Sequence, residues 1–210
     1  MATDYRKMAE KAHIRATREP VQDKTEELTD EERNLAGKVT AHIRDAEAEE
    51  GLEIILAIDG WERSSACIHL AGQCHKNAGR LESADDLLQR AVIMRKQEGK
   101  SQLAISSLNA LAINLVAQGR RKVAMQRLDD AIGLDGGHRL SHFNKLCLLS
   151  LQKDLEGLAN AFDTLDDSYP GWPRDVLMCE WLEGDATLGF LRESQLWHRI
   201  SERMNQGDGQ

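Results

Sequence analysis

The chain has 210 residues, a formal charge of −8 at pH 7, three prolines and 4% aromatic residues. Its pI is near 5.4. Binding to nucleic acid or to an anionic membrane through charge needs clustered Lys and Arg, so this balance argues against both kinds of partner. The abundance of Ala, Leu, Glu and Arg favours helix over strand, and we expect an all-α protein.

Residues 1–28 are charged and lack clear hydrophobic periodicity, so we expect a flexible or weakly ordered segment. They contain neither the basic leader nor the apolar run of a signal peptide. No later stretch approaches the roughly 20 apolar residues of a membrane span. The sequence therefore predicts a cytoplasmic protein that does not enter a membrane.

The first clear helix begins at Thr29, because Thr29 and Glu32 have the spacing of a capping box. We expect this helix to run to about Glu50 and to break at Gly51. The apolar residues 52–58 follow, and a helix is favoured there over a short strand. Residues 29–64 are thus expected to form N-terminal capping helices.

A repeated spacing dominates the middle of the chain. Each copy has large and small apolar residues, a Gly-Arg pair, and then apolar residues at helical intervals. The first copy consists of Ile68, Ala71, Gly72, His75, Gly79-Arg80, Ala84, Leu88 and Ala91, and the second of Leu108, Leu111, Ala112, Leu115, Gly119-Arg120, Ala124, Leu128 and Ala131. This pattern predicts two helical hairpins, because glycine supplies the positive φ that ends a helix and small residues let the returning helix approach closely.

The spacing resembles the tetratricopeptide repeat, whose signature runs W-x2-L-G-x2-Y, then A-x3-F, then A and often P. The small positions match, whereas aliphatic residues or His75 stand at the aromatic positions, and Lys96 and Gly136 at the final proline. A third, looser copy runs from Phe143 to Pro170 if one residue is deleted at Lys153-Asp154. The resemblance implies a right-handed α-solenoid of about three hairpins over residues 65–170.

The interval from Gly79 to Gly119 is 40 residues, against about 34 in the standard repeat. The excess is expected within the polar residues 97–102, as extended helix ends or a longer turn.

Three of the four Trp residues follow Pro170, in residues 171–203. We expect C-terminal capping helices here, the last over residues 188–200, and a disordered tail over 204–210. The aromatic residues either cover the open end of the stack or form an interface with a partner or a second copy. A homo-oligomer through the terminal helices therefore stays open.

Motifs for chemistry are sparse. Cys67, Cys74, Cys147 and Cys179 include no CxxC pair, and we interpret them as small buried hydrophobes. His138 and His142 are one helical turn apart, but no third ligand accompanies them, so no metal site is assigned. Phosphate-loop and nucleophile-elbow motifs are missing, and adjacent carboxylates such as Asp129-Asp130 point apart on a helix. We therefore expect no enzyme, no cofactor and no catalytic residue.

The resemblance does imply a concave groove lined by the first helix of each hairpin. The groove is expected to be open and lined by residues that are not used for packing. The residues that the resemblance places there are His69, Gln73, Lys76, Ser106, Asn109, Ile113, Ser141, Asn144 and Leu148. Asn109 and Asn144 occupy equivalent places, and an Asn can bind both polar groups of a peptide unit. The basic residues are too few for the carboxylate clamp of some tetratricopeptide co-chaperones, which favours a neutral or amphipathic partner segment, with basic residues as an option because the surface is acidic.

The function expected from these features is that of an adaptor or chaperone-like protein that binds a peptide or helix of another protein in the groove. Two alternatives stay open at this point. One is a dedicated secretion chaperone, since those of the three-repeat kind are small, acidic and cytosolic. The other is a structural subunit that is fixed in a larger protein assembly through apolar end surfaces.

Overall fold

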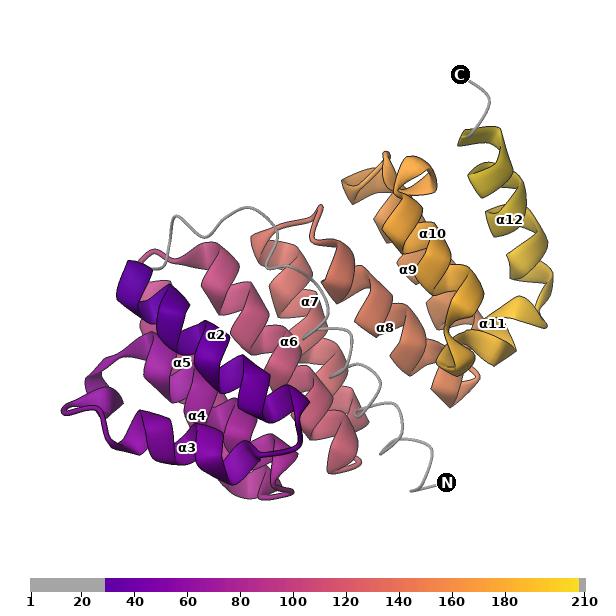
Figure 1. Ribbon diagram of the computed structural model, residues 1–210. Helices are drawn as coiled ribbons and strands as arrows, with labels where there is room; N and C mark the ends of the chain where they lie inside the picture. Colours follow the sequence, from indigo (N-terminus) through magenta and orange to yellow (C-terminus); the bar gives the residue numbers. More distant parts are fainter. Residues whose placement is uncertain (1–28, 208–210) are drawn as a thin grey trace. The chain divides into compact units, whose positions relative to one another are not determined.

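The computed structural model of the chain describes residues 29–207, so the expectation for residues 1–28 and the end of the expected tail lie outside the described part. Within that part the chain forms helices and no strand, which confirms the all-α prediction (Figure 1). The α-helices are α2 (Asp30–Arg44), α3 (Ala48–Leu56), α4 (Ser65–Asn77), α5 (Leu81–Gln97), α6 (Ser101–Ala117), α7 (Arg121–Leu134), α8 (Arg139–Gln152), α9 (Leu155–Ser168), α10 (Val176–Gly184), α11 (Gly189–Arg192) and α12 (Gln195–Gly207). Three 3-10 helices add η2 (Trp61–Arg63), η3 (Trp172–Arg174) and η4 (Ala186–Leu188).

The helices fall into two compact units, and the division lies inside α7, between Arg127 and Leu128. The first unit contains α2 to α6 and the start of α7. The second contains the end of α7 and all later helices. The division therefore falls within the block 65–170 that the sequence assigns to repeats.

The turns of the first unit are built as the spacing predicts. Helix α4 ends at Asn77 and α5 begins at Leu81, and Gly79 between them has a φ of +77°. Gly119, between α6 and α7, has the same φ. A side chain would strain both positions, which explains why glycine stands there.

The polar residues 97–102 also form a turn. Helices α5 and α6 each have 17 residues and leave only Glu98–Lys100 between them, with Gly99 at a φ of +73°. The extra length of this copy is thus taken up by extended helix ends, one of the two expected arrangements.

Gly72 is the point of closest approach between α4 and α5. A Cβ atom at Gly72 would lie 2.9 Å from Cγ of Leu88, closer than carbon atoms can pack. Leu88 and Ala84 are both fully buried on the facing side of α5. A small residue is therefore required at this crossing, as the sequence pattern suggested.

At the start of the first unit, the capping box at Thr29 is confirmed, because the Thr29 hydroxyl accepts from the backbone N–H of Glu32 and Glu32 bonds back to the Thr29 N–H. The expected break at Gly51 is wrong. The chain turns earlier, around Ala46 with its φ of +66°, and Gly51 lies inside α3. A Cβ at Gly51 would lie 3.2 Å from Sγ of Cys74, so this glycine serves a close contact with α4.

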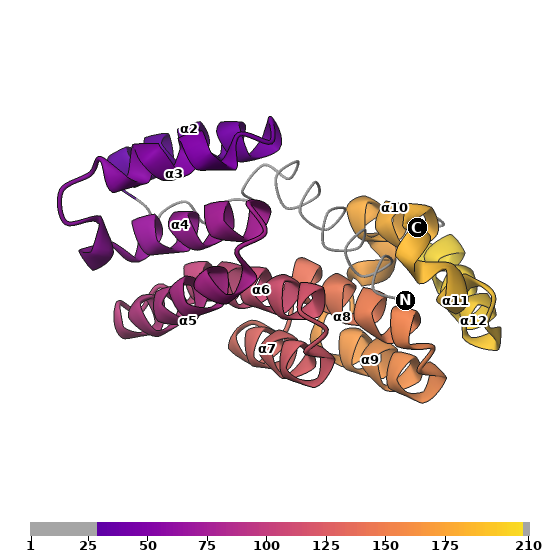
Figure 2. The ribbon, with the colours of Figure 1, turned by 90° about the horizontal axis from the view of Figure 1, so that it is seen from below.

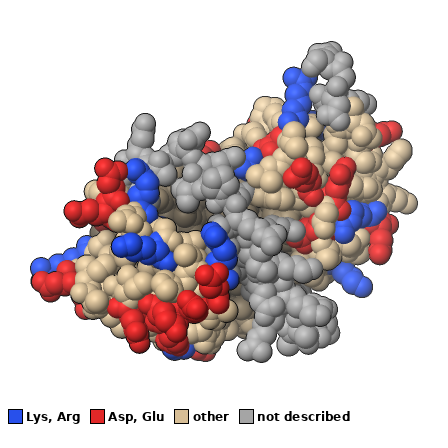
Figure 3. All heavy atoms as spheres, viewed as in Figure 1, with Lys and Arg blue, Asp and Glu red and all other residues tan. Residues whose placement is uncertain are grey.

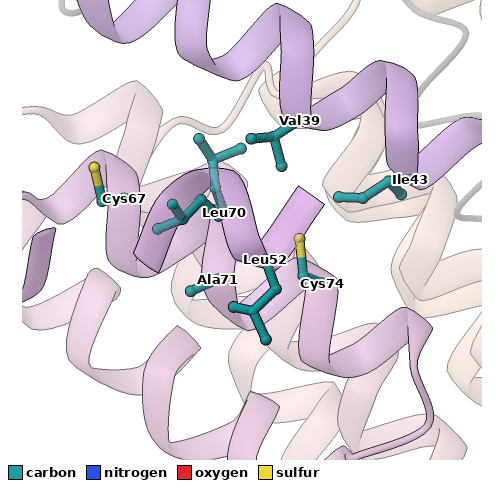
Figure 4. Packing of buried hydrophobic residues seen from close by; sticks show 8 residues of the cluster. Val39, Ile43, Leu52, Cys67, Leu70, Ala71 and Cys74 are labelled. Atoms are coloured by element: carbon teal, nitrogen blue, oxygen red, sulfur yellow. The ribbon is translucent and has the colours of Figure 1, made fainter. Parts of the chain in front are cut away.

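The expectation of a helix rather than a strand near residues 52–58 is confirmed, since α3 covers most of that stretch. Helices α2 and α3 pack against α4, and α4 in turn contacts α5 and α6. Figure 2 shows α4 lying between these two groups of helices. The buried cluster shared by α2, α3 and α4 contains Val39, Ile43, Leu52, Ile55, Cys67, Leu70, Ala71 and Cys74 (Figure 4).

An ion pair links each Gly-Arg turn of the first unit to an earlier helix. The guanidinium of Arg80 bonds both carboxylate oxygens of Glu49 on α3, at 2.5 and 3.0 Å. The guanidinium of Arg120 bonds Asp85 on α5 at 2.6 Å. His75, expected as a large packing residue, accepts from Nε of Arg80 at 2.9 Å and so orients the first of these arginines.

In the second unit, α8 and α9 contact each other across the two-residue turn Lys153-Asp154. Lys153 takes the left-handed conformation, with a φ of +58°, where the earlier copies have glycine. This turn is one residue shorter than those of the first unit, which agrees with the deletion that aligns the third copy. Asp154 caps α9 by accepting from the N–H of Gly157.

Two of the Trp residues after Pro170, Trp172 and Trp181, cover this hairpin. The Trp172 ring lies 5.8 Å from that of Phe162 on α9, and the Trp181 ring 4.9 Å from that of Phe143 on α8. Both tryptophans are buried. The contacts support the interpretation of Trp172 and Trp181 as covering residues.

The last helices differ from the sequence expectation. The single helix expected over residues 188–200 is interrupted, because α11 ends at Arg192 and α12 begins at Gln195. Helix α12 then continues to Gly207, past the point where the tail was expected to begin. Met204 on α12 is buried, which explains why the helix extends that far.

Candidate functional site

The groove residues expected on α4 and α6 lie on helices that contact each other. On α4, His69, Gln73 and Lys76 follow at intervals of four and three residues and so share one face. His69 is buried, whereas Gln73 and Lys76 are half-buried. This α4 face is the part of the expected site that combines polar side chains with access to solvent.

On α6 the expected residues differ in exposure. Ser106 is exposed, and its hydroxyl donates to the carbonyl of Gln102. Asn109 and Ile113 are buried, and the Asn109 amide donates to the carbonyl of Ile105 one turn earlier. The expectation that all three are left out of packing is therefore wrong for Asn109 and Ile113.

A chain of hydrogen bonds joins the two helices. The Lys76 ammonium can only donate, and it lies 3.5 Å from Oε1 of Gln73. That contact makes the side-chain nitrogen of Gln73 the donor to Nε2 of His69, at 3.0 Å. With Nε2 accepting, the proton of a neutral imidazole sits on Nδ1, which reaches Oγ of Ser107 on α6 at 3.1 Å.

Arg95, at the end of α5, completes this chain. Its Nη1 donates to Oγ of Ser107 at 2.7 Å and to the carbonyl oxygen of Leu103 at 2.8 Å. The name α4–α6 chain is used below for Lys76, Gln73, His69, Ser107 and Arg95. It links three helices, and His69, Ser107 and Arg95 within it are buried.

Sequence reasoning missed Ser107 and Arg95. In the sequence Arg95 appears as a basic residue near a helix end, where charge usually complements the helix dipole. In the structure it is buried, because α6 folds back over the end of α5. Only the pairing of α5 with α6 could have revealed this contact.

Burial sets the protonation states of His69 and Lys76. Desolvation lowers the pKa of His69 well below 6.5, and the positive charges of Arg95 and Lys76 act in the same direction. His69 is therefore neutral near pH 7, in agreement with its accepting Nε2. Desolvation also lowers the pKa of the Lys76 ammonium to about 8.

Ser107 and His69 are as close as a nucleophile and its base, but the arrangement does not activate the hydroxyl. Ser107 Oγ accepts from both Arg95 and His69, whereas a nucleophilic serine must donate its proton to the imidazole. Ser107 is also fully buried. The pair therefore acts as a link between helices.

The remaining three expected groove residues lie on α8, in the second unit, and all are buried. Ser141 bonds His138, which caps α8 by accepting from the Ser141 N–H through Nδ1. Asn144 and Leu148 lie further along the same helix. The expectation that these α8 positions are open is wrong, because this helix is covered in its own unit.

His138 and His142, the metal candidates considered from their spacing, have structural contacts. Burial lowers the pKa of His138 to about 4 and keeps it neutral as a cap. Nε2 of His142 donates to the carbonyl of Gly136 at 2.7 Å and lies 3.2 Å from Oγ of Ser168. Across residues 29–207, no group of three or more His, Cys, Asp or Glu side chains is placed to hold a metal ion.

Comparison with known proteins adds no relative: no protein-family model, no curated protein and no solved structure matches the chain. None of the helices between residues 29 and 207 combines the length and the apolar character that crossing a bilayer requires.

Proposed function

We propose that this protein is a non-enzymatic adaptor or chaperone-like protein of the cytoplasm, related in architecture to the tetratricopeptide-repeat proteins. It binds an extended or helical segment of another protein on the face shared by α4 and α6. On this face Ser106 is exposed, and Gln73 and Lys76 are half-buried.

The repeat architecture is supported by the turns. Gly79-Arg80 and Gly119-Arg120 have the same glycine conformation, and each arginine pairs with a carboxylate on the second helix of the preceding pair. The α2–α3 pair takes part in this scheme through Glu49. It can therefore be counted as a hairpin of the same stack.

The binding function is carried by one observation: the first helices of two successive hairpins contact each other and share a face of hydrogen-bonding side chains. A rigid polar face suits a peptide, because peptide units carry donors and acceptors that need fixed partners. The α4–α6 chain fixes Gln73 and Lys76 in place, so that less conformational entropy is lost on binding.

Random peptides displayed on phage provide the test. Peptides selected on the full chain are synthesised with a fluorophore, and their affinity is measured by anisotropy. A bulky Ser106→Trp change on the exposed side of α6 should weaken binding by about tenfold or more through steric block. The matched control is Glu53→Trp, on an exposed position of α3.

Circular dichroism of both variants must show the helix content of the parent chain. Equal affinity for the parent and Ser106→Trp would place binding elsewhere. Failure to select any peptide would contradict the proposed function itself.

A further inference from the structure

Lys76 is a cation that lacks a carboxylate partner within the described residues. It is half-buried on α4, and its contact within the described residues is the neutral side-chain carbonyl of Gln73, 3.5 Å away. The shift of its pKa to about 8 is caused by desolvation alone. A desolvated ammonium without a counter-charge costs free energy, which a negative ligand can recover.

Other partly buried cations of the chain show what is missing. Lys145 on α8 has a side chain that is 19% exposed, and its ammonium pairs with Asp129 at 2.7 Å. Arg139 is 14% exposed and pairs with Asp175 at 2.7 Å. No carboxylate between residues 29 and 207 forms such a pair with Lys76, so this lysine differs from Lys145 and Arg139.

The charges near Lys76 favour an anion as its partner. The groups whose charges act on neighbouring His69 are Arg95 and Lys76, both positive, and His69 itself is neutral. In contrast, Figure 3 shows acidic side chains gathered over α3, where Glu49, Glu50 and Glu53 are exposed. An anion approaching this protein is therefore repelled by α3 and attracted locally at the α4–α6 face.

We propose that the segment bound on the α4–α6 face carries an acidic side chain, Asp or Glu, whose carboxylate pairs with the ammonium of Lys76. This inference rests on the proposed peptide-binding function and names the chemistry of its partner. The neutral or amphipathic segment expected from the sequence is thereby narrowed to one with a negative charge at one position. A single ammonium sets one acidic position and leaves the rest of the segment to Gln73, Ser106 and their neighbours.

The experiment uses the same displayed peptides, which are fused at their carboxyl ends, so that any acid selected is a side chain. Selection is run in parallel on the parent chain and on Lys76→Met, Lys76→Arg and Lys76→Glu. Lys38→Met, at an exposed position of α2, is the matched control. Selected peptides are then made with amidated ends, each with a partner in which the acid is replaced by Gln or Asn.

The parent, Lys76→Arg and Lys38→Met should enrich an Asp or Glu at one fixed position. Lys76→Met should lose that preference, and Lys76→Glu should select Lys or Arg there. Replacing the acid in the peptide should weaken binding to the parent by about tenfold and binding to Lys76→Met by less than twofold, as expected for one desolvated ion pair in a double-mutant cycle.

Peptides that bind without a fixed acidic position, or an acidic preference that survives in Lys76→Met, would overturn this inference and leave the proposed function standing. If neither the parent protein nor any variant selects peptides, the proposed function fails and the inference fails with it. Folding of each variant is checked by circular dichroism, and Lys76→Glu keeps the test valid if Lys76→Met proves unstable.

Discussion

The two units hold the first helix of a hairpin in place by different means. In the first unit, α4 is fixed by small residues such as Gly72 and by the α4–α6 chain. In the second, α8 is fixed by an aromatic contact to Trp181 and an ion pair to Asp175, both from the segment after Pro170. Polar groups on α4 thus remain half-accessible, whereas those expected to bind on α8 are buried.

The difference suggests that α8 has a structural role and that α4 has a binding role. Trp181 covers part of α8, and polar side chains at the start of this helix serve its cap, as His138 does. A helix whose polar face is braced by neighbouring hairpins can hold side chains in readiness for a ligand. Binding is therefore proposed on α4 and α6, and the following changes test the contrast from the largest effect to the smallest.

The largest effect is expected at the aromatic cover of the second unit. Trp172→Ala removes a buried ring that packs on Phe162 and whose Nε1 donates to Asp166. It should destabilise that unit by about 3–5 kcal/mol. Trp197, which is only half-buried, is the matched control and should cost less when changed to Ala.

Amide hydrogen exchange read by mass spectrometry measures this effect in each unit separately. Protection should fall in α8 to α12 and stay unchanged in α2 to α6. A fall of the same size in both units would show that the two regions are not held independently.

Acid should also weaken the second unit through His138. In the folded chain Nδ1 of His138 accepts from the Ser141 N–H, and the pKa is about 4 rather than 6.5. The unfolded chain therefore takes up the proton first, so stability is complete above pH 6.5 and falls as the pH drops towards 4. The loss should reach about 3 kcal/mol.

His138→Asn keeps an oxygen that can cap α8 but cannot titrate. Urea unfolding at a series of pH values should show a smaller acid loss in this variant, reduced to the part that His142 and other groups contribute. An unchanged pH dependence would mean that the cap does not carry the effect.

Close packing in the first unit can be tested by two glycines in helices. Gly72→Ala places a methyl group 2.9 Å from Cγ of Leu88 and should cost about 1–3 kcal/mol. Gly37→Ala on α2 meets nothing within 4 Å and should stabilise the helix by up to about 1 kcal/mol. Thermal unfolding should therefore shift in opposite directions, and a shared direction would contradict the crossing at Gly72.

The α4–α6 chain can be broken at one atom. Ser107→Ala removes the oxygen that accepts from Arg95 and His69, and should cost about 1–2 kcal/mol because buried donors lose their partner. Ser106→Ala, at the exposed neighbouring position, should change the unfolding free energy by less than about 0.5 kcal/mol. Equal effects at the two serines would show that the α4–α6 chain contributes little to the free energy of unfolding.

Local sequence patterns predicted those helix ends and caps that are determined by a few neighbouring residues. Gly79 and Gly119 could be placed because a helix end with positive φ needs glycine, and Thr29 because its cap is complete within four residues. The prediction that Gly51 ends a helix was wrong because this glycine makes room for a contact with Cys74, far along the chain. Spacing alone cannot distinguish a glycine that ends a helix from one that another helix approaches.

The candidate site was less predictable. The tetratricopeptide resemblance proposed His69, Gln73 and Lys76 together, and residues three and four apart on a helix do share one face. Arg95 and Ser107 join them only when α5 and α6 pack, which no local pattern reports. The burial of Asn144 and Leu148 likewise depends on how helices of the second unit cover α8.

The claim that a partner's carboxylate completes the α4–α6 face can be tested by following the ¹³Cε resonance of Lys76 in lysine-labelled protein, assigned with Lys76→Arg, while the pH is raised. In the free protein the pKa should lie near 8, well below the ordinary 10.5, and a bound acidic peptide should raise it by about one unit or more. A pKa near 10.5 in the free protein, or one that does not move when the peptide binds, would contradict the account.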